Sequence, residues 1–316
     1  MPAVRDIVSI GAVVLTLGVA PLASADETDN FTCRNRPLRD SLAALDTLMN
    51  TAVHAAVERA NGRGASCDGA CLVHELQEAV GGNVRAVTGI PHARLARLVE
   101  NQPGIERCHL NFRESIYGAR PYNQPWLAPF TGRIIFLADS IQLAGRLVGI
   151  DKINHFIREG LAHWQRVHDG GEGIEAVMAR ELGAPGWQLR MNEHGLKGMT
   201  LTGVVSYADL AASYSGFRFW SDLLMTDSAD SFVAYDETTR QFRQRRAFTF
   251  RMYVTDAWDE SINPSAFHPD LAKQVAAALR ARSVEIPIAS CQRLTALPQA
   301  RLYVNPGCFD TSEMGR

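Results

Sequence analysis

The chain has 316 residues, 46% of them hydrophobic, and a formal net charge of −2 at pH 7. This hydrophobic content is enough to build a core, and the length allows one large domain or two small ones. The near-neutral charge argues against general binding to nucleic acid or to anionic membranes, because both require a basic surface. A local basic run at 240–246 is interpreted as the solvated face of a hairpin.

The first 25 residues have the pattern of an export leader. Arg5 supplies a positive charge, an apolar run covers 7–20, and Ala-Ser-Ala at 23–25 fits the cleavage site of a secretory signal peptide. The apolar run is shorter than the ~20 residues that span a bilayer, so a membrane anchor is the weaker interpretation. We therefore expect a periplasmic mature chain that begins at Asp26 and has no transmembrane span.

Six cysteines, all of them after the leader, predict disulfide bonds in an exported chain. Closing a short loop costs less entropy than closing a long one. We therefore favour a bond between Cys291 and Cys308 and leave the pairing of the other four open. The rival interpretation is a zinc site on Cys67 and Cys71. It is weaker, because no second Cys or His pair follows at zinc-finger spacing.

Apolar periodicity and turn residues predict a chain of helices with little β structure. The predicted elements are, in order, helices at 36–60, 71–80 and 92–100, a proline-rich loop at 117–129, a hairpin or short helix at 133–148, helices at 151–168 and 173–182, an irregular stretch at 186–204, a helix at 206–224, a hairpin within 231–254 and a helix at 269–282.

This pattern predicts a mainly α fold: a compact helical domain with a minor β-hairpin element, stabilised by disulfides. The proline-rich loop marks the predicted domain boundary. It separates an N-terminal helical region, 26–120, from a main helical domain, 121–316, and the leader, 1–25, precedes both.

The predicted helix at 151–168 contains a polar ladder, which consists of Asp151, His155, Glu159 and His163. Each step of four residues rotates by about 40°, so these side chains share one side of the helix, away from the apolar stripe. His and Glu bind zinc and similar metals, which favours a functional ladder. The alternative is the solvated face of an ordinary helix. The spacing differs from the His-Glu-x-x-His of zinc proteases, and we interpret Glu159 and His163 as surface residues.

The stretch 206–220 begins with a capping box formed by Ser206 and Asp209. Ser213 lies one turn beyond Asp209. Gly216 in the middle of a helix costs about 1 kcal/mol relative to Ala. Such a glycine allows another backbone to pack closely against the helix.

The stretch 253–264 places Asp259 and Glu260 directly after Trp258, with Asn263 in a turn. Neighbouring carboxylates beside an aromatic ring can give one acid a raised pKa, which general acid catalysis requires. The same acids are equally suited to the start of a short helix.

Three segments carry a resemblance: GIDKINHF (149–156), TGVVSYADLAASYSGFRFW (202–220) and YVTDAWDESINPSAF (253–267). In this order, behind a leader, the chain resembles a group of uncharacterised exported bacterial proteins over about residues 145–270. The group has no established reaction, and Ser213 stands where it has Asn. The resemblance implies these candidate positions: Asp151, Lys152, His155, Asp209, Trp258, Asp259, Glu260 and Asn263.

The first functional hypothesis is an exported hydrolase that acts on a cell-envelope polymer or its fragments, with or without a divalent metal. The predicted catalytic residues are His155, Asp151, Asp209 and Glu260, and the predicted metal ligands are His155 and Asp209. The predicted substrate-binding residues are Lys152, Trp258, Asp259 and Asn263.

The second hypothesis is a non-catalytic periplasmic binding or structural protein. In it, Asp151, His155 and Asp209 form a buried polar network that fixes helix packing. Geometry distinguishes the two, because chemistry requires His155, Asp209 and Glu260 to meet at one point.

Overall fold

Helices account for most of the fold, in agreement with the predicted mainly α class. The computed structural model describes residues 26–82, 84–85, 91–118, 136–185, 190–195, 197–200, 202–223, 231–282 and 288–309. The predicted leader and most of the predicted loop at 117–129 lie outside the described residues.

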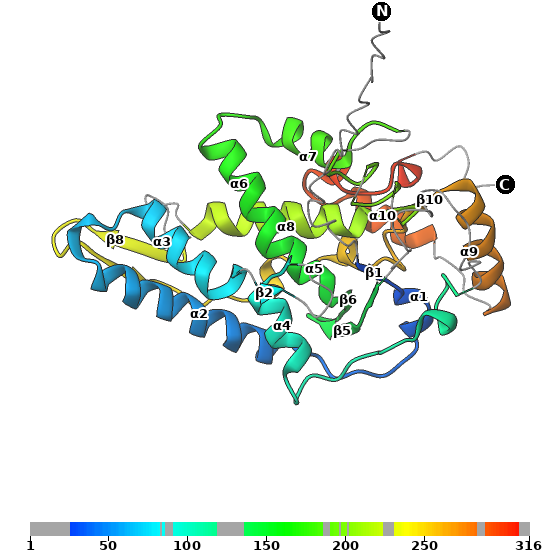
Figure 1. Ribbon diagram of the computed structural model, residues 1–316, viewed down its shortest axis with the longest axis horizontal. Helices are drawn as coiled ribbons and strands as arrows, with labels where there is room; N and C mark the ends of the chain where they lie inside the picture. Colours follow the sequence, from blue (N-terminus) through cyan, green and yellow to red (C-terminus); the bar gives the residue numbers. More distant parts are fainter. Residues whose placement is uncertain are drawn as a thin grey trace, which may run out of the picture.

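The described helices include all the predicted ones and two that were not predicted, at 30–33 and 288–295; the bounds agree to within a few residues, except that the helix predicted at 36–60 begins later. They are α1 (Asn30–Cys33), α2 (Leu42–Gly62), α3 (Gly69–Leu76), α4 (Arg94–Asn101), α5 (Ile150–Asn154), α6 (Gly160–His168), α7 (Ile174–Leu182), α8 (Tyr207–Leu223), α9 (Pro269–Ala281) and α10 (Ile288–Thr295). In Figure 1, α2 runs along one edge with α3 and α4 beside it, while α6 crosses α8 above them.

The described strands are short and form two-stranded sheets. β1 (Asp26–Thr28) pairs in parallel with β4 (Phe136–Ala138). The other pairs are antiparallel: β2 (Val84–Arg85) with β3 (Pro91–His92), β5 (Ser140–Leu143) with β6 (Arg146–Gly149), β7 (Val204–Val205) with β10 (Ala266–Phe267), and β8 (Val233–Asp236) with β9 (Gln241–Gln244).

The segment predicted as either a hairpin or a short helix contains the β5–β6 hairpin. Ser140 pairs with Gly149, and the turn residues Ala144 and Gly145 have φ values of 53° and 78°. Positive φ at both central positions is the geometry of the tight hairpin turns that match strand twist. The hairpin ends directly at α5, so it fixes where the polar ladder begins.

The second predicted hairpin is present, but it occupies only the first part of its predicted range. The alternating residues that suggested it, from Phe248 to Val254, follow β9, and Phe250–Met252 form a 3₁₀ turn. Phe248 and Phe250 are buried although they are not in a strand. Met252, between the buried Phe250 and Val254, is 39% exposed, so the alternation of apolar residues in the sequence does not mark the buried face of a strand.

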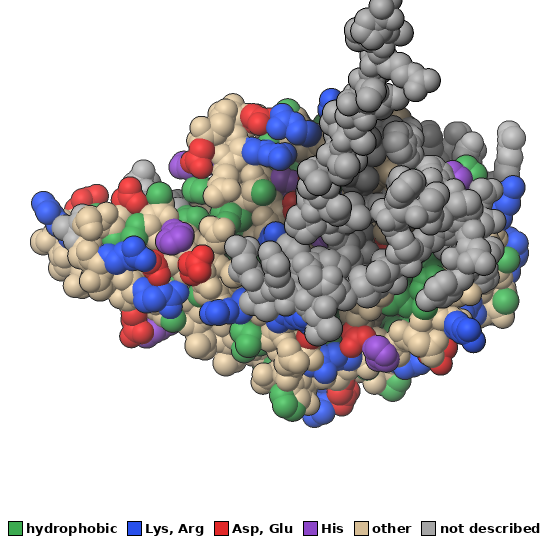
Figure 2. All heavy atoms as spheres, in the orientation of Figure 1, with side chains coloured by type: hydrophobic (Ala, Val, Ile, Leu, Met, Phe, Trp, Pro, Cys, Tyr) green, Lys and Arg blue, Asp and Glu red, His purple; other side chains and the backbone are tan. Residues whose placement is uncertain are grey.

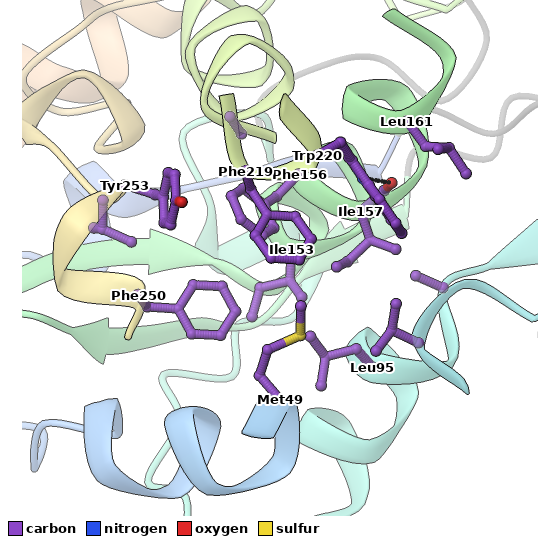
Figure 3. Close-up of a cluster of buried hydrophobic side chains, with 14 of the residues drawn as sticks. Met49, Leu95, Ile153, Phe156, Ile157, Leu161, Phe219, Trp220, Phe250 and Tyr253 are labelled. Carbon is purple, nitrogen blue, oxygen red and sulfur yellow. Dashed lines mark hydrogen bonds between the residues drawn. The ribbon is translucent and has the colours of Figure 1, made fainter. Parts of the chain in front are cut away.

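Phe156, at the junction of α5 and α6, lies at the centre of an aromatic cluster (Figure 3). Its ring centroid is 5.3 Å from that of Phe219, 5.4 Å from Phe250, 5.5 Å from Tyr253 and 5.7 Å from Trp258. These rings come from α8 and from the segment after β9. The cluster therefore holds together the three segments that carry the resemblance.

Gly160 and Gly216 form the point of closest approach between α6 and α8. A Cβ on Gly216 would overlap the carbonyl oxygen of Phe156, and one on Gly160 would meet the backbone of Gly216. The close packing predicted for Gly216 is confirmed. Because His155 precedes this crossing and Asp209 lies on α8, the two glycines set the distance between the facing side chains.

Three disulfides join Cys33 to Cys108, Cys67 to Cys71 and Cys291 to Cys308. The predicted Cys291–Cys308 bond is confirmed. The zinc interpretation of Cys67 and Cys71 is wrong, because their sulfur atoms bond to each other and cannot act as thiolate ligands.

The main hydrophobic core contains side chains from both sides of residue 120, among them Met49 and Val53 of α2 and Ile153 of α5. Among the described residues, no helix combines the length and apolar character needed to cross a membrane. On the face shown in Figure 2, acidic and basic side chains are interspersed.

We expect Gly216→Ala to destabilise the fold by about 1–3 kcal/mol or more, because the added methyl group forces two backbones apart. Gly62→Ala is the matched control: Gly62 is also helical, nothing lies within 4 Å of its added Cβ, and alanine is the better helix former. Urea unfolding of both variants measures the difference. Equal stability of the two variants would contradict the proposed crossing.

Candidate functional site

The predicted helix at 151–168 is present, but it is not uniform. α5 and α6 are joined by a single π-helical turn, η4 (His155–Glu159). π-Turns are uncommon and are enriched at functional positions, because the extra residue re-aims the side chains that follow. His155 is the first residue of this turn.

The polar ladder faces the interior of the protein at its first two positions. Asp151 Oδ1 accepts a hydrogen bond from Thr28 Oγ1 at 2.8 Å. His155 Nε2 lies 3.3 Å from Asp209 Oδ2, and His155 Nδ1 lies 3.5 Å from Ser213 Oγ. β1 and α8 therefore cover the first half of the ladder, which the alternative interpretation expected to face solvent.

Glu159 and His163 also contact protein partners. The interpretation as a surface residue is wrong for the buried His163, whereas the Glu159 side chain is 25% exposed. Lys197 Nζ donates to Glu159 Oε2 at 2.8 Å and to Glu181 Oε1 at 2.6 Å. His163 Nε2 lies 3.6 Å from Glu181 Oε2, and the His163 side chain is only 1% exposed. We call Glu159, His163, Glu181 and Lys197 the outer cluster. α7 and the segment after it cover this half of the ladder.

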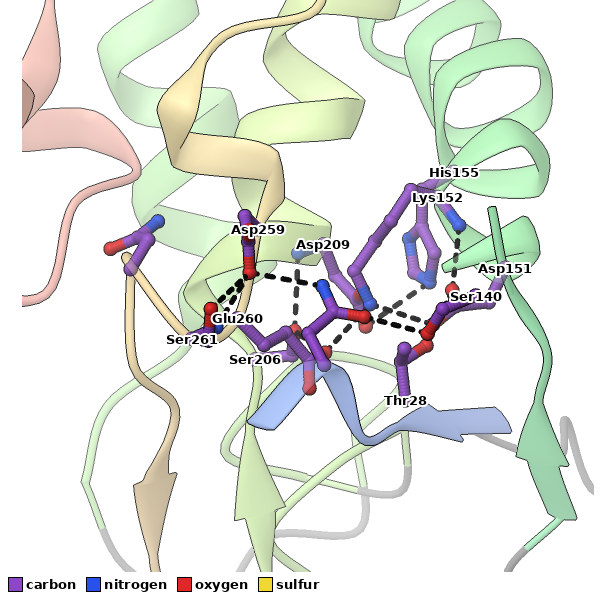
Figure 4. A network of polar contacts seen from close by, with 12 residues as sticks. Thr28, Ser140, Asp151, Lys152, His155, Ser206, Asp209, Asp259, Glu260 and Ser261 are labelled. Carbon is purple, nitrogen blue, oxygen red and sulfur yellow. Dashed lines mark hydrogen bonds and ion pairs between the residues drawn. The ribbon is translucent and has the colours of Figure 1, made fainter. Parts of the chain in front are cut away.

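The segments 149–156, 202–220 and 253–267 meet at the Lys152 ammonium group (Figure 4). Lys152 Nζ lies 2.7 Å from Asp151 Oδ2, 2.6 Å from Asp209 Oδ1 and 2.7 Å from Glu260 Oε1. The Lys152 side chain is 0% exposed. We call these four residues the polar centre. Asp151 and Glu260 accept hydrogen bonds from this ammonium group, and Asp209 forms an ion pair with it.

Hydroxyl groups complete the polar centre. Ser206 Oγ donates to Glu260 Oε1 at 3.1 Å and accepts from the backbone N–H of Asp209 at 3.2 Å. Ser206 thus caps the start of α8 and also binds Glu260, but it forms only half of the predicted capping box. Its own N–H donates to Glu193 Oε2 at 3.3 Å.

A divalent metal does not fit the polar centre as it is built. One oxygen each from Asp151, Asp209 and Glu260 lies within 4.8 Å of the others, which is a spacing that suits a metal ion. Lys152 Nζ contacts all three carboxylates, so a metal among them would face a buried ammonium group at close range. His155 and Asp209, the predicted ligands, supply two donor atoms, whereas catalytic zinc sites use three protein ligands.

Trp258 and Asp259, predicted to bind substrate, have internal partners. Trp258 is 0% exposed, and its Nε1 donates to Ser215 Oγ at 3.2 Å. Asp259 Oδ1 accepts hydrogen bonds from the N–H and the hydroxyl group of Ser261 at 2.8 and 2.7 Å and from Asn30 Nδ2 at 3.2 Å. These contacts give both residues a role in packing, and their role toward a substrate stays a prediction.

Asn263, the remaining predicted substrate-binding residue, holds the C-terminal segment. Its Nδ2 donates to the carbonyl oxygens of Ala257 and Tyr303, each at 3.1 Å, and its Oδ1 accepts from the N–H of Asn305 at 3.0 Å. The amide therefore joins two backbone segments about 40 residues apart in sequence.

Burial and charge together set the protonation of the acids in and around the polar centre. Burial raises the pKa of Glu260 to about 8, and the charges of Asp151 and Asp209 add to this against the opposing effect of Lys152. Burial also raises the pKa of Asp151, of Glu27 and of Glu193.

Asp209 differs from these acids. Burial alone would raise its pKa, but the neighbouring His155 and Lys152 outweigh burial and hold the pKa below its usual value. Among the carboxylates that contact Lys152, Asp209 is therefore the one that stays ionised most readily. Environments that drive the pKa values of neighbouring acids apart are typical of acid–base sites and also of structural ion networks.

Four residues in and around these clusters were not predicted from the sequence: Glu27, Thr28, Glu181 and Lys197. One signal in the sequence pointed to part of this set. The chain has three lysines among 32 basic residues, and two of them, Lys152 and Lys197, each contact two or more carboxylates. A lysine ammonium group is more compact than an arginine guanidinium group, which suits both buried positions.

We expect Lys152→Met to destabilise the fold by about 3–5 kcal/mol, because it leaves buried carboxylates without a counter-charge. Lys152→Arg should also destabilise, since a planar guanidinium group cannot replace a tetrahedral ammonium among three acceptors. Lys273→Met, at an exposed position on α9, is the control and should have little effect. Chemical denaturation checks this, and a Lys152→Met protein as stable as the control would refute the assignment.

We also expect stability to fall as the pH rises from about 5 to about 8. An acid with a raised folded-state pKa stabilises the fold below its unfolded pKa, and that contribution is lost as pH rises toward the folded value. Each such group contributes a slope of up to about 1.4 kcal/mol per pH unit. Glu260→Gln should reduce the slope and the exposed Glu237→Gln should not. Urea unfolding at several pH values tests this; a slope unchanged by Glu260→Gln would contradict it.

Comparisons with protein-family models, with curated proteins and with solved structures give no significant match.

Proposed function

We propose that the protein is an exported hydrolase whose chemistry is carried by a relay of Ser213, His155 and Asp209. The observation that supports it is the position of His155. Its ring lies between a hydroxyl group at 3.5 Å and a carboxylate at 3.3 Å. This is the order of groups with which a histidine, oriented by a carboxylate, activates a hydroxyl nucleophile.

Each member of the relay has a defined task. The tautomer with hydrogen on Nε2 directs that hydrogen toward Asp209 Oδ2, at 3.3 Å, and leaves the Nδ1 lone pair facing Ser213 Oγ. His155 then accepts the Ser213 proton as the hydroxyl oxygen attacks the carbonyl carbon of an ester or amide, and gives it to the oxygen or nitrogen that leaves. A water molecule, deprotonated by the same histidine, then releases the acyl group from Ser213. Because both ring nitrogens face protein groups, Ser213 is the group that His155 activates at this geometry.

Lys152 supports the relay electrostatically. It contacts Asp209 through Oδ1, while His155 faces Oδ2. The ammonium group therefore helps to keep Asp209 ionised, which holds the His155 tautomer and stabilises the imidazolium that forms during proton transfer. In this proposal Asp151 and Glu260 hold Lys152 in place, and no step uses a metal.

Two features support the cellular setting and substrate class. The predicted leader and the three disulfides both favour the periplasm, where disulfides persist. A periplasmic hydrolase meets cell-envelope polymers and their fragments.

At the relay, the His155 side chain is 15% exposed and Ser213 is 1% exposed, so His155 is the member nearest to solvent.

A fluorophosphonate probe, which reacts covalently with activated serine hydroxyls, tests the relay. We expect labelling of Ser213 in the mature protein, identified by peptide mass, and a loss of labelling of about 100-fold or more in Ser213→Ala and in His155→Ala. Ser221→Ala, on the same helix, is the matched control. Metal removal by a chelator should not change labelling. A folded wild-type protein with no labelling and no hydrolysis of ester, amide or envelope-fragment substrates would refute the relay.

The second candidate is the non-catalytic binding or structural protein, and one observation favours it. All four members of the polar centre are buried, with Lys152 completely enclosed. In this case His155→Ala should lower the melting temperature strongly, while the wild-type protein shows neither labelling nor hydrolysis. The same proteins therefore decide between the two candidates.

A further inference from the structure

We propose that residues 26–31 form a latch that closes over the polar centre, and that the leader must be removed before this latch closes. The inference rests on the proposed leader and its cleavage site, and not on the relay chemistry. It starts from the position of the first described residues: β1 begins at Asp26, directly after the predicted cleavage site at 23–25.

The latch is buried from its second residue onward. Glu27, Thr28, Asp29, Asn30 and Phe31 are each at most 4% exposed. The start of a mature chain is ordinarily exposed and poorly ordered unless specific contacts hold it. Five consecutive buried residues, three of them acidic or amide-bearing, therefore require particular partners.

Thr28 and Asn30 bind two of the three segments that carry the resemblance. Thr28 Oγ1 donates to Asp151 Oδ1 at 2.8 Å. Asn30 Nδ2 donates to Asp259 Oδ1 at 3.2 Å and to the carbonyl oxygen of Leu147 at 2.9 Å. Figure 4 shows Thr28 reaching the polar centre from the strand beneath it.

The surface that the latch covers has room for the Thr28 side chain and partners for its backbone. A Cβ on Gly149 would collide with the Thr28 side chain, so the glycine at the end of β6 leaves the space that Thr28 fills. Asp29 Oδ2 accepts the backbone N–H of Ile116 at 2.7 Å, and the Tyr117 hydroxyl donates to the carbonyl oxygen of Thr28 at 3.3 Å. The segment at 116–117 thus holds the other side of the latch.

These contacts conflict with proteolytic processing. A peptidase binds several residues on each side of the bond that it cuts, in extended and accessible form. The bond before Asp26 is only one residue away from buried Glu27. The peptidase and the polar centre therefore compete for the same residues, and a closed latch shields the cleavage site.

The order of events follows from this competition. Cleavage takes place while residues 26–31 are still outside the fold, and insertion of Thr28 and Asn30 then completes the hydrogen bonding of Asp151 and Asp259. A chain that closes the latch before it is cut escapes processing.

The test compares the accessibility of this bond in two folded proteins. In the first, a soluble tag ending in the recognition sequence of a specific protease directly precedes Asp26. In the second, a flexible Gly/Ser spacer of about ten residues separates the recognition sequence from Asp26. Under native conditions we expect tag release from the first protein to be at least about tenfold slower, because cleavage follows the population of the open latch. In denaturant the two rates should be equal.

A latch variant separates this effect from simple crowding by the folded body. Thr28→Gly removes the side chain that contacts Asp151 and that fills the space beside Gly149. This variant should therefore accelerate native tag release in the first protein. Thr51→Gly, at an exposed position on α2, is the control. Equal native rates with and without the spacer would overturn the latch. So would a Thr28→Gly protein that, while still folded by circular dichroism, releases the tag no faster than the Thr51→Gly control.

Discussion

The burial of the Lys152 ammonium group is the constraint on which the rest of the structure depends. Moving an ammonium ion out of water costs several kcal/mol even after the protein relaxes around it. The cost is offset only if counter-charges lie at hydrogen-bond distance, and here one oxygen of each of three carboxylates lies within 2.7 Å. One of these carboxylates is the neighbour of Lys152 in sequence, and the other two are brought by α8 and by the segment after η6 (Asp256–Trp258).

The surrounding elements bring the counter-charges to the buried Lys152 ammonium group and hold them there. The glycine pair at the crossing of α6 and α8 lets Asp209 approach. The aromatic cluster around Phe156 excludes water and fixes the third segment, and Ser206 ties Glu260 to the start of α8. Since burial also raises the pKa of Glu260 to about 8, protonation of Glu260 removes part of the negative charge. This leaves Asp209 as the acid best placed to hold His155.

The sequence predicted the helices well, because their apolar stripes are regular, and it predicted the Cys291–Cys308 bond from loop length alone. It predicted the polar ladder as one side of a helix, but not which side faces the protein. A stripe of Asp, His, Glu and His resembles a solvated face, and only the covering elements show otherwise: Asp209 on α8, and Glu181 and Lys197 from α7 and the segment after it.

The contact between the three segments also could not be predicted from the sequence. Lys152 and Glu260 are 108 residues apart, and nothing local in either segment encodes their contact. Spacing and periodicity alone did not predict this contact, and the resemblance to an exported group stays a prediction. An aromatic residue beside two acids suggests a binding surface, and the ring of Trp258 lies in the aromatic core.

The long sequence separations within the polar centre have a consequence for how the chain folds. A partly folded chain that buries Lys152 with only its neighbour Asp151 carries a desolvated charge with too few partners, and so has a high free energy. Compact states that lack either distant carboxylate are penalised in the same way, which widens the energy gap between the native state and its competitors. The buried lysine thus acts as a check on topology: the core becomes favourable to close only when segments from distant parts of the chain have arrived together.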